Sequence, residues 1–205
     1  MKAMLLVPNH YVVAEPETLA METAEAELAQ AIERRFGEVS LAAFEARIGN
    51  NSLQGKLRRN ATRLHRLNLL SNHDGIIRKL LNYSWAVAVF PFALAKHQWT
   101  YVFFPCPSAV IAAWWAVILG RPYGLYVRGT WLAEDGSTSW VWGQVLRHAA
   151  FIVATGEAFR KKISRYNQNV HNEVPLTKLR VAILGGEVKR RAAAIRRILF
   201  VGRLS

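Results

Sequence analysis

The longest uncharged stretch of the chain, residues 98–120, contains two prolines, Pro105 and Pro107. Residues 99–119 alone would be long enough to cross a bilayer as one helix. However, each proline lacks a backbone N–H donor and pushes the residue before it toward an extended conformation. We therefore interpret the stretch as a buried strand followed by a helix, with a membrane span as the less favoured alternative.

The two pieces have the composition of these elements. Residues 99–104, WTYVFF, are aromatic or β-branched and apolar on both faces, as in a central strand of a parallel sheet. The following segment begins at Pro107 and ends before Gly120, which are typical residues for the start and the end of a helix. The sequence thus predicts one strand–turn–helix unit here.

Similar units precede and follow this one. We predict further strands at 4–8, 38–44, 64–70, 123–127 and 151–154, and further helices at 17–36, 76–96, 138–148 and 157–166, with a loop at 47–60. Ser137 or Thr138 would cap the third of these helices. Strands that alternate with helices favour parallel pairing, so we expect an α/β fold with a Rossmann-like, doubly wound, mostly parallel sheet.

Ligands of such sheets bind at the carboxyl ends of the strands. The residues that directly follow predicted strands are Asn9, His10 and Tyr11; Cys106 to Ser108; Arg128, Gly129 and Thr130; and Thr155, Gly156 and Glu157. We expect Arg128 to contact a ligand, while the alternative is a structural ion pair with Glu134, Asp135 or Glu157. For His10 the alternative is an ordinary loop residue.

The charge of the chain is positive and uneven. Lys and Arg outnumber Asp and Glu by 27 to 14, and beyond residue 50 the ratio is 23 to 6. A hydrophobic fraction of 52% excludes a disordered chain. The excess positive charge therefore lies on a folded protein and indicates a polyanionic partner: nucleic acid, an anionic membrane or phosphate groups. Trp85, Trp99, Trp114 and Trp115 lie in apolar runs, which makes nucleic acid the less favoured partner.

Other chemistries find little support. None of the six histidines has metal-ligand spacing, and neither a dinucleotide-binding nor a P-loop glycine motif occurs. Cys106, the single cysteine, lies between two prolines, where a buried and inert thiol is the favoured interpretation. The first residues lack the features of a secretory signal, so we expect a cytoplasmic protein.

Three segments resemble the retaining, group 1 (family 4) glycosyltransferases of the GT-B fold. LGRPYGLYVRGTW resembles a strand and turn of the acceptor-side domain that lie in the interdomain cleft, and FIVATGEAFRKKISRY resembles the strand and helix that follow. The ending ILFVGRLS resembles the first strand of the donor-side domain. On this resemblance, residues 1–185 form the acceptor-side domain, 186–197 a basic linker, and 198–205 the first strand of the next domain.

The resemblance implies a nucleotide-sugar donor and a glycan or lipid-linked acceptor, in polysaccharide or glycolipid biosynthesis. It implies no metal, no cofactor and no catalytic nucleophile, with Arg203 contacting donor phosphates and Asn9, His10, Tyr11, Arg128, Gly129, Thr130, Gly156 and Glu157 lining the cleft. The donor-side Glu-x7-Glu motif is absent from these residues, so we expect the chain alone to be inactive. The alternative function is a basic nucleic-acid-binding α/β module.

A basic stretch suggests attachment to the inner face of a membrane. It comprises Lys56, Arg58, Arg59, Arg63, Arg66, Arg78 and Lys79, with Asp74 as the single acid among them. Three aromatic residues, Trp85, Phe90 and Phe92, follow and could anchor the chain in the interface. The alternative is a solvated basic face whose aromatic neighbours lie in the core.

Overall fold

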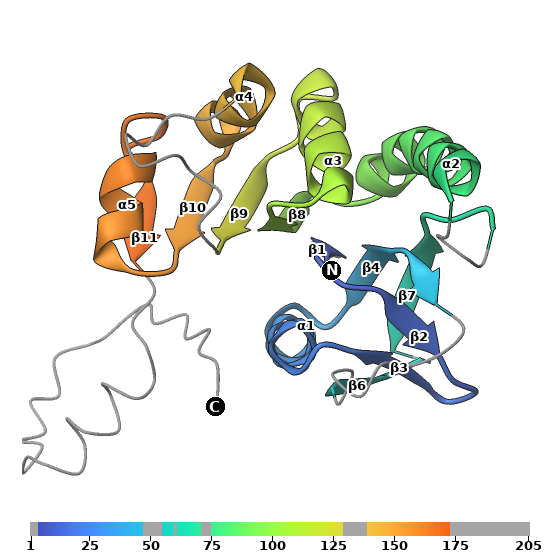
Figure 1. Cartoon of the computed structure of the whole chain (residues 1–205). Coiled ribbons are helices and arrows are strands. Elements are labelled where there is room, and N and C mark those ends of the chain that lie inside the picture. Colours follow the sequence, from blue (N-terminus) through green and yellow to red (C-terminus); the bar gives the residue numbers. More distant parts are fainter. Residues whose placement is uncertain (1–3, 47–54, 60, 71–74, 129–138, 173–205) are drawn as a thin grey trace, which may run out of the picture.

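The computed structural model describes residues 4–46, 55–59, 61–70, 75–128 and 139–172, and Figure 1 shows how their elements are arranged. The strands are β1 (Met4–Val7), β2 (Val12–Ala14), β3 (Thr18–Met21), β4 (Val39–Ala43), β5 (Glu45–Ala46), β6 (Gly55–Arg58), β7 (Thr62–Arg66), β8 (Trp99–Phe104), β9 (Tyr123–Val127), β10 (Phe151–Ala154) and β11 (Val170–Asn172). The helices are α1 (Thr23–Phe36), α2 (Ile76–Ala95), α3 (Pro107–Ile118), α4 (Trp140–His148) and α5 (Glu157–Ile163).

A seven-stranded parallel sheet forms the centre, in the order β11-β10-β9-β8-β1-β4-β7. The chain moves outward from β1 through β4 to β7, then returns to the other side of β1 with β8. The order of the strands therefore reverses between β1 and β8, and this switch point is where doubly wound sheets bind their ligands. The predicted Rossmann-like α/β fold is confirmed.

Strand β1 shows how the sheet separates two cores. Leu5 and Val7 point into the core beneath α2, α3 and α4, whereas Leu6 points into the core shared with α1. Figure 1 shows α2, α3 and α4 side by side over one face of the sheet and α1 over the other. Leu5, Leu6 and Val7 are all fully buried, which fixes the strand at the centre of the domain.

The predicted strand–turn–helix unit is present as β8 and α3. Pro107 stands in the first turn of α3, and Cys106 accepts a hydrogen bond from the Ala109 N–H as the N-cap. No helix in the described part of the chain is long and apolar enough to cross a membrane.

A second, four-stranded sheet, β5-β2-β3-β6, was not predicted from the sequence. The helix expected from residue 17 begins only at Thr23, because residues 18–21 pair with β2 and β6 as strand β3. The Glu22 carboxylate then caps α1 by accepting the Glu25 N–H. Part of the expected loop at 47–60 is likewise strand β6, while residues 47–54 lie outside the described chain.

Four smaller expectations need correction. Strand β7 covers 62–66 instead of 64–70, because the backbone N–H groups of Leu69 and Leu70 donate to the Asn82 side chain of α2 and not to a strand. Helix α4 begins at Trp140 with Ser139 as its cap, and α5 ends at Ile163 instead of Tyr166. Strand β11 was not expected, and the predicted linker and final strand at 186–205 lie outside the described residues.

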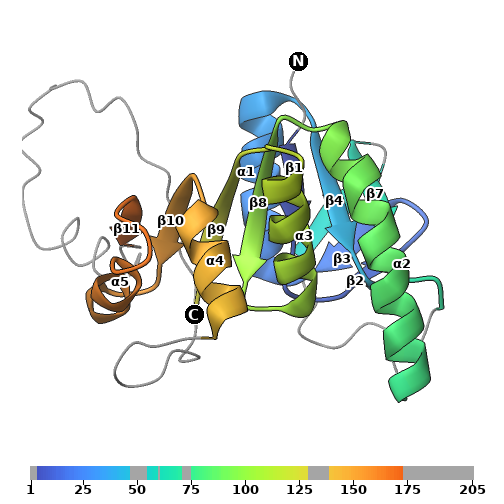
Figure 2. The same cartoon turned by 90° about the horizontal axis from the view of Figure 1, so that it is seen from above.

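Helix α2 differs from its neighbours in where it begins. Its N-terminal end projects past the carboxyl ends of the strands, beyond the arrowheads of β4 and β8 in Figure 2. The helix continues through Pro91 without interruption. Its later half packs on α3 and the sheet through side chains such as Phe90, Ala93 and Leu94.

Candidate ligand site at the switch point

The loop after β1 and the first turn of α1 meet at a buried carboxylate. Glu25 is fully buried, and its Oε1 accepts the backbone N–H of Asn9 at 2.9 Å. The Glu25 backbone N–H donates in turn to Glu22 Oε2 at 3.2 Å. A carboxylate in the first turn of a helix is favoured by the helix dipole, so α1 both positions this group and stabilises its charge.

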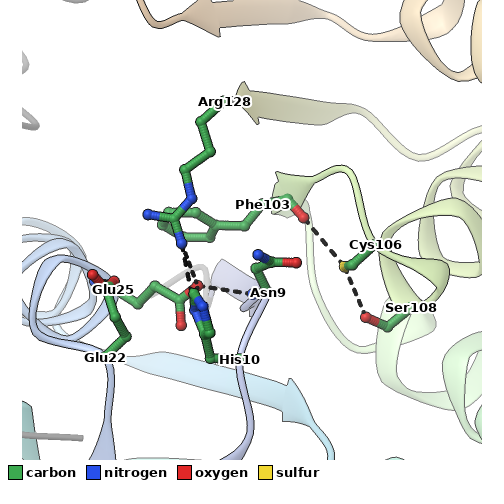
Figure 3. A network of polar contacts seen from close by, with 8 residues as sticks. All are labelled: Asn9, His10, Glu22, Glu25, Phe103, Cys106, Ser108 and Arg128. Atoms are coloured by element: carbon green, nitrogen blue, oxygen red, sulfur yellow. Dashed lines mark hydrogen bonds and ion pairs between the residues drawn. The ribbon is translucent and has the colours of Figure 1, made fainter. Parts of the chain in front are cut away.

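His10 lies against the same carboxylate and remains partly open to solvent. Its Nδ1 is 3.2 Å from Glu25 Oε1 (Figure 3). The hydrogen bond with Glu25 raises the pKa of His10, and partial burial opposes that rise. His10 therefore holds its proton to a higher pH than a free histidine does.

Arg128 reaches the cluster from the end of β9. Its Nη2 lies 3.8 Å from Glu25 Oε1 and 3.4 Å from His10 Nδ1. The guanidinium carbon is 6.0 Å from the centre of the Phe103 ring, within reach of a cation–π contact. Glu25 and the Phe103 ring contact the guanidinium, and the Arg128 side chain is 26% exposed, so it remains partly accessible to solvent.

His10 Nδ1 cannot serve both neighbours in the same way. When it carries a proton it donates to Glu25, and the nearby positive charge of Arg128 opposes part of the rise in the pKa of His10. When it is unprotonated it can accept from Arg128. The protonation of His10 thus selects which of the two side chains it binds, and the choice is made at the switch point of the sheet.

Glu25 has one further property. Its second oxygen, Oε2, is buried and forms no hydrogen bond with any described residue. A buried carboxylate oxygen without a donor is energetically costly.

One ligand atom each of His10, Glu22 and Glu25 lie within 4.8 Å of one another, a spacing that a metal ion could use. However, Nη2 of Arg128 stands within 4 Å of two of these groups, so a cation already occupies the neighbourhood. The Glu22 carboxylate is also engaged as the cap of α1. We interpret the group as an ion-pair network and expect no metal in it.

The other predicted residues have different surroundings. Tyr11 is exposed, with its ring 6.3 Å from that of Phe44. Glu157 pairs with Arg160 on its own helix at 2.6 Å, and Gly156 precedes that helix with a φ of 96°. Gly129, Thr130, Glu134, Asp135 and Arg203 lie outside the described residues. The ion-pair partner of Arg128 seen in the structure, Glu25, was not among the partners predicted from the sequence.

Cys106 has a structural role in α3. Its Sγ accepts the Ala109 N–H at 3.4 Å and lies 3.1 Å from the Ser108 hydroxyl. Burial raises the pKa of the Cys106 thiol, which agrees with the inert thiol expected from the sequence.

The predicted membrane surface divides into paired and unpaired cations. Lys56 pairs with Glu15 at 3.1 Å, Arg66 pairs with Glu45 at 2.6 Å, and Arg59 donates to the Glu15 carbonyl at 3.0 Å. Within the described residues no ion pair is formed by the other four, Arg58, Arg63, Arg78 and Lys79. Of the three expected anchors, Trp85 and Phe92 are exposed, but Phe90 is fully buried and cannot anchor the chain.

A surface pocket of about 430 Å³ lies elsewhere, at the C-terminal end of α1 and along β6. Its lining includes Glu33, Arg34, Lys56 and Arg58. This is the opposite end of α1 from Glu25, so the pocket is separate from the switch-point cluster, and we assign it no role.

Comparison with solved structures gives similar folds at low identity. UDP-GlcNAc 2-epimerase from Neisseria meningitidis, bound to UDP-GlcNAc, matches with a TM-score of 0.49 and 14% identity, over 90% of this chain and 52% of that one. The UDP-GlcNAc 2-epimerase from Methanocaldococcus jannaschii matches with a TM-score of 0.46 and 10% identity, over 84% and 45%. MurG from Acinetobacter baumannii matches with a TM-score of 0.45 and 14% identity, over 77% and 42%. The chain spans about half the length of each.

No curated protein matches the chain by sequence. A family model does: the glycosyl transferase 4-like domain matches residues 20–177. This match covers most of the chain, including the helix that carries Glu25 and the strand that precedes Arg128. It confirms the resemblance to the N-terminal domains of GT-B glycosyltransferases, and the chain therefore belongs to the glycosyl transferase 4-like domain family.

Proposed function

We propose that this chain is the acceptor-side domain of a nucleotide-sugar-dependent, retaining glycosyltransferase of polysaccharide or glycolipid biosynthesis. The family match over residues 20–177 supports a glycosyltransferase domain. The observation that carries the proposal is the cluster of His10, Glu25 and Arg128 beside the point where the strand order reverses. Three elements distant in sequence deliver these side chains to the one edge where such sheets bind ligands.

The chemistry of the cluster suits a hydroxyl-bearing acceptor. The Arg128 guanidinium has N–H donors to spare, because its contact with Glu25 is long, and both Arg128 and His10 are partly exposed. His10 can donate or accept according to its protonation. A sugar presents hydroxyl groups that both donate and accept, so it can bind Arg128 and His10 at once.

The cluster's place in the reaction would be orientation of the acceptor. In a retaining transfer without a protein nucleophile, the domain holds the acceptor hydroxyl near the donor while cations neutralise the leaving diphosphate. We assign the first task to His10 and Arg128, with Asn9, Tyr11, Gly129, Thr130, Gly156 and Glu157 as further cleft-lining residues. We assign phosphate contact to Arg203, and no metal or cofactor is required.

We propose further that residues 1–205 alone do not turn over. The family match covers an acceptor-side domain, and a GT-B reaction needs a donor-side domain as well. Incubation with UDP- and GDP-sugars should give no hydrolysis or transfer above background. Robust turnover by these residues would contradict this part of the proposal.

Acceptor binding can be tested on the chain as it is. Saturation-transfer NMR with a panel of free oligosaccharides and short-chain lipid-linked sugars should show contacts to the wild-type protein. Binding should weaken about tenfold in Arg128→Gln, because one charge-assisted hydrogen bond is lost. Arg147→Gln, which removes an exposed arginine from the last turn of α4, is the matched control and should bind as the wild type does.

Two outcomes would overturn the proposed function. One is the absence of any sugar contact in the whole panel. The other is tight, salt-sensitive binding of single-stranded RNA or DNA, which would favour the nucleic-acid-binding alternative.

We also propose a cytoplasmic location with peripheral attachment to the inner face of the membrane. Arg58, Arg63, Arg78 and Lys79, which form no ion pair with any described residue, support attraction to anionic lipid. This location is independent of the reaction and is tested separately below.

A further inference from the structure

The N-terminal half of α2 exposes an apolar surface that a folded domain would ordinarily bury. Ile76, Ile77, Leu80 and Leu81 are between 45% and 78% exposed. They occupy the first two turns of the helix, here called the α2 tip and defined as residues 76–81. Single exposed apolar residues need no explanation, but four large ones on two consecutive turns do.

These four side chains point away from the body of the protein. At about 100° per residue, they lie within an arc of about 140° on the helix. Asn82, which is fully buried, falls nearly opposite the middle of that arc, and Ala86 and Ala93 further along the helix are buried on the same side as Asn82. A surface helix normally turns its apolar stripe toward the core; here the stripe of the α2 tip is turned outward.

The outward stripe continues along the rest of α2. Trp85, Val87 and Phe92 are also exposed and extend the apolar face toward the C-terminal end of the helix. The side that packs on the domain is formed by other residues, among them Phe90 and Leu94. The helix is therefore apolar on both sides, with one side serving the core and the other facing solvent.

Within helix α2 itself, all charged residues are positive. Arg78 and Lys79 are exposed. Viewed down the helix axis, they lie on either side of the buried Asn82, so one of them borders each edge of the apolar arc. Helix α2 contains no acidic residue. An apolar arc flanked by cations matches the interface of an anionic bilayer, where acyl chains and negative headgroups are adjacent.

We infer that the α2 tip inserts into the headgroup region of an anionic membrane, with Ile76, Ile77, Leu80 and Leu81 buried among the acyl chains and Arg78 and Lys79 on the headgroups. This deepens the proposed membrane location by naming its contact surface, and it does not depend on the proposed reaction. The membrane surface expected from the sequence changes in two ways. The aliphatic residues of the tip take the place of the buried Phe90 as anchors, and the cations of β6 and β7 contribute less than Arg78 and Lys79.

The position of the tip fits this role. Helix α2 projects past the carboxyl ends of the strands, which is the same edge of the sheet that carries His10, Glu25 and Arg128. A membrane that contacted the tip would thus lie on the side of the domain from which the switch-point cluster is reached. A lipid-linked molecule could approach the cluster while its lipid stays in the bilayer.

The test is co-sedimentation of the whole 205-residue chain with lipid vesicles. One set consists of phosphatidylcholine and the other contains about one third phosphatidylglycerol, the anionic lipid. We expect binding to the anionic vesicles at low salt, a marked decrease at high salt and little binding to the neutral ones.

Two sets of variants locate the contact. Ile77→Ser combined with Leu80→Ser should lower the affinity for anionic vesicles about tenfold or more, because two aliphatic side chains no longer enter the interface. Arg78→Gln combined with Lys79→Gln should lower it about tenfold at low salt and much less at high salt. Since all four residues are exposed, unchanged circular dichroism and melting temperature should show that both variants fold.

Matched controls lie on other helices. Ile118→Ser changes an exposed aliphatic residue at the far end of α3, and Lys161→Gln with Lys162→Gln removes two cations from α5. These helices pack on other parts of the sheet, and both controls should bind vesicles as the wild type does.

Three results would overturn the inference. Equal binding to neutral and anionic vesicles would remove the anionic headgroups as the partner, and no binding at low salt would remove the membrane altogether. Equal losses in the α2 and control variants would show that the contact is not at the tip. Finally, a wild-type dimer in analytical ultracentrifugation that the tip variant converts to monomer, without any vesicle binding, would make a second copy of the chain the occupant.

Discussion

Helices α1 and α2 both begin at the carboxyl edge of the central sheet, but their first turns have opposite environments. The first turn of α1 buries a carboxylate and gathers His10, Asn9 and Arg128 around it. The first two turns of α2 bury little and expose four large aliphatic side chains. The comparison shows that one edge of a sheet can carry a polar cluster and an apolar projection for different partners.

The difference arises from what stands beside each helix. Strand β6 and the small sheet cover α1, and Leu28, Ala29 and Ile32 are buried in the core there. The tip of α2 extends past the end of the sheet, so no strand of the described residues covers it (Figure 2). An amphipathic pattern therefore determines that a helix forms, whereas its neighbours determine which side is buried.

The largest expected effect separates the two sides of α2. Phe90→Ala should lower the free energy of unfolding by about 3–5 kcal/mol, because it leaves a cavity in the core. Phe92→Ala, two residues further along on the exposed side, should change it by less than about 0.5 kcal/mol. Urea denaturation of both variants measures this directly. Similar losses in the two would mean that the outward face of α2 is covered.

The next effect concerns how α2 is attached to the domain. The buried Asn82 accepts the N–H groups of Leu69 and Leu70 and donates to the Leu70 carbonyl. Asn82→Ala should cost about 1–3 kcal/mol, because these backbone groups lose their partner. Leu80→Ala on the tip should be close to neutral. If the Asn82 variant is as stable as the wild type, the start of α2 is not held by these bonds.

A smaller effect concerns the buried carboxylate of α1. Glu25→Gln should lower the free energy of unfolding by about 1–2 kcal/mol. The loss is moderate because the amide oxygen can still accept the Asn9 N–H, and because the partly exposed His10 and Arg128 can bind water instead. It should also return the pKa of His10 toward its ordinary value, because the hydrogen bond that raises it is weakened. Proton NMR titration of His10 measures that shift, and His65, whose pKa is lowered to about 4 chiefly by burial, is the internal reference.

The sign of the pH dependence follows from the same bond. A raised pKa in the folded state means that the contribution of His10 to stability is present below its unfolded value near 6.5 and is lost as the pH rises through the folded value. The Glu25→Gln variant should lack this loss. An unchanged His10 titration in the variant would show that Glu25 does not control the histidine.

The smallest effect compares the two helix caps. Glu22 caps α1 with its side chain, whereas α2 has Gly75 at the N-cap and no side-chain cap. Glu22→Ala should therefore cost about 0.5–1 kcal/mol. Gly75→Ala should cost about as much, but through backbone strain, because Gly75 has a φ of 89°. A steric clash does not contribute, since no atom lies within 4 Å of an added Cβ. A thermal-unfolding comparison that finds either variant neutral would revise the corresponding cap.

The sequence by itself determined the central units of this protein. Strands β8, β9 and β10 begin and end where the sequence predicts, because each is a short apolar run bounded by turn residues, and Pro107 sets the start of α3. The fold class followed from the alternation of such units. His10 and Arg128 were found as candidates because residues after parallel strands gather at one edge of the sheet.

Only the tertiary structure decided the rest. Strands β2, β5 and β6 are two to four residues long, and they form because distant segments supply their hydrogen-bond partners. In the sequence, Glu25 lies inside the helix expected at 17–36, with nothing that points to a site; only the start of α1 at Thr23 and its packing against β1 place Glu25 beside His10 and Arg128. The apolar residues of the α2 tip were part of a helical pattern, and whether that pattern faced the core or the solvent depended on where the sheet ends.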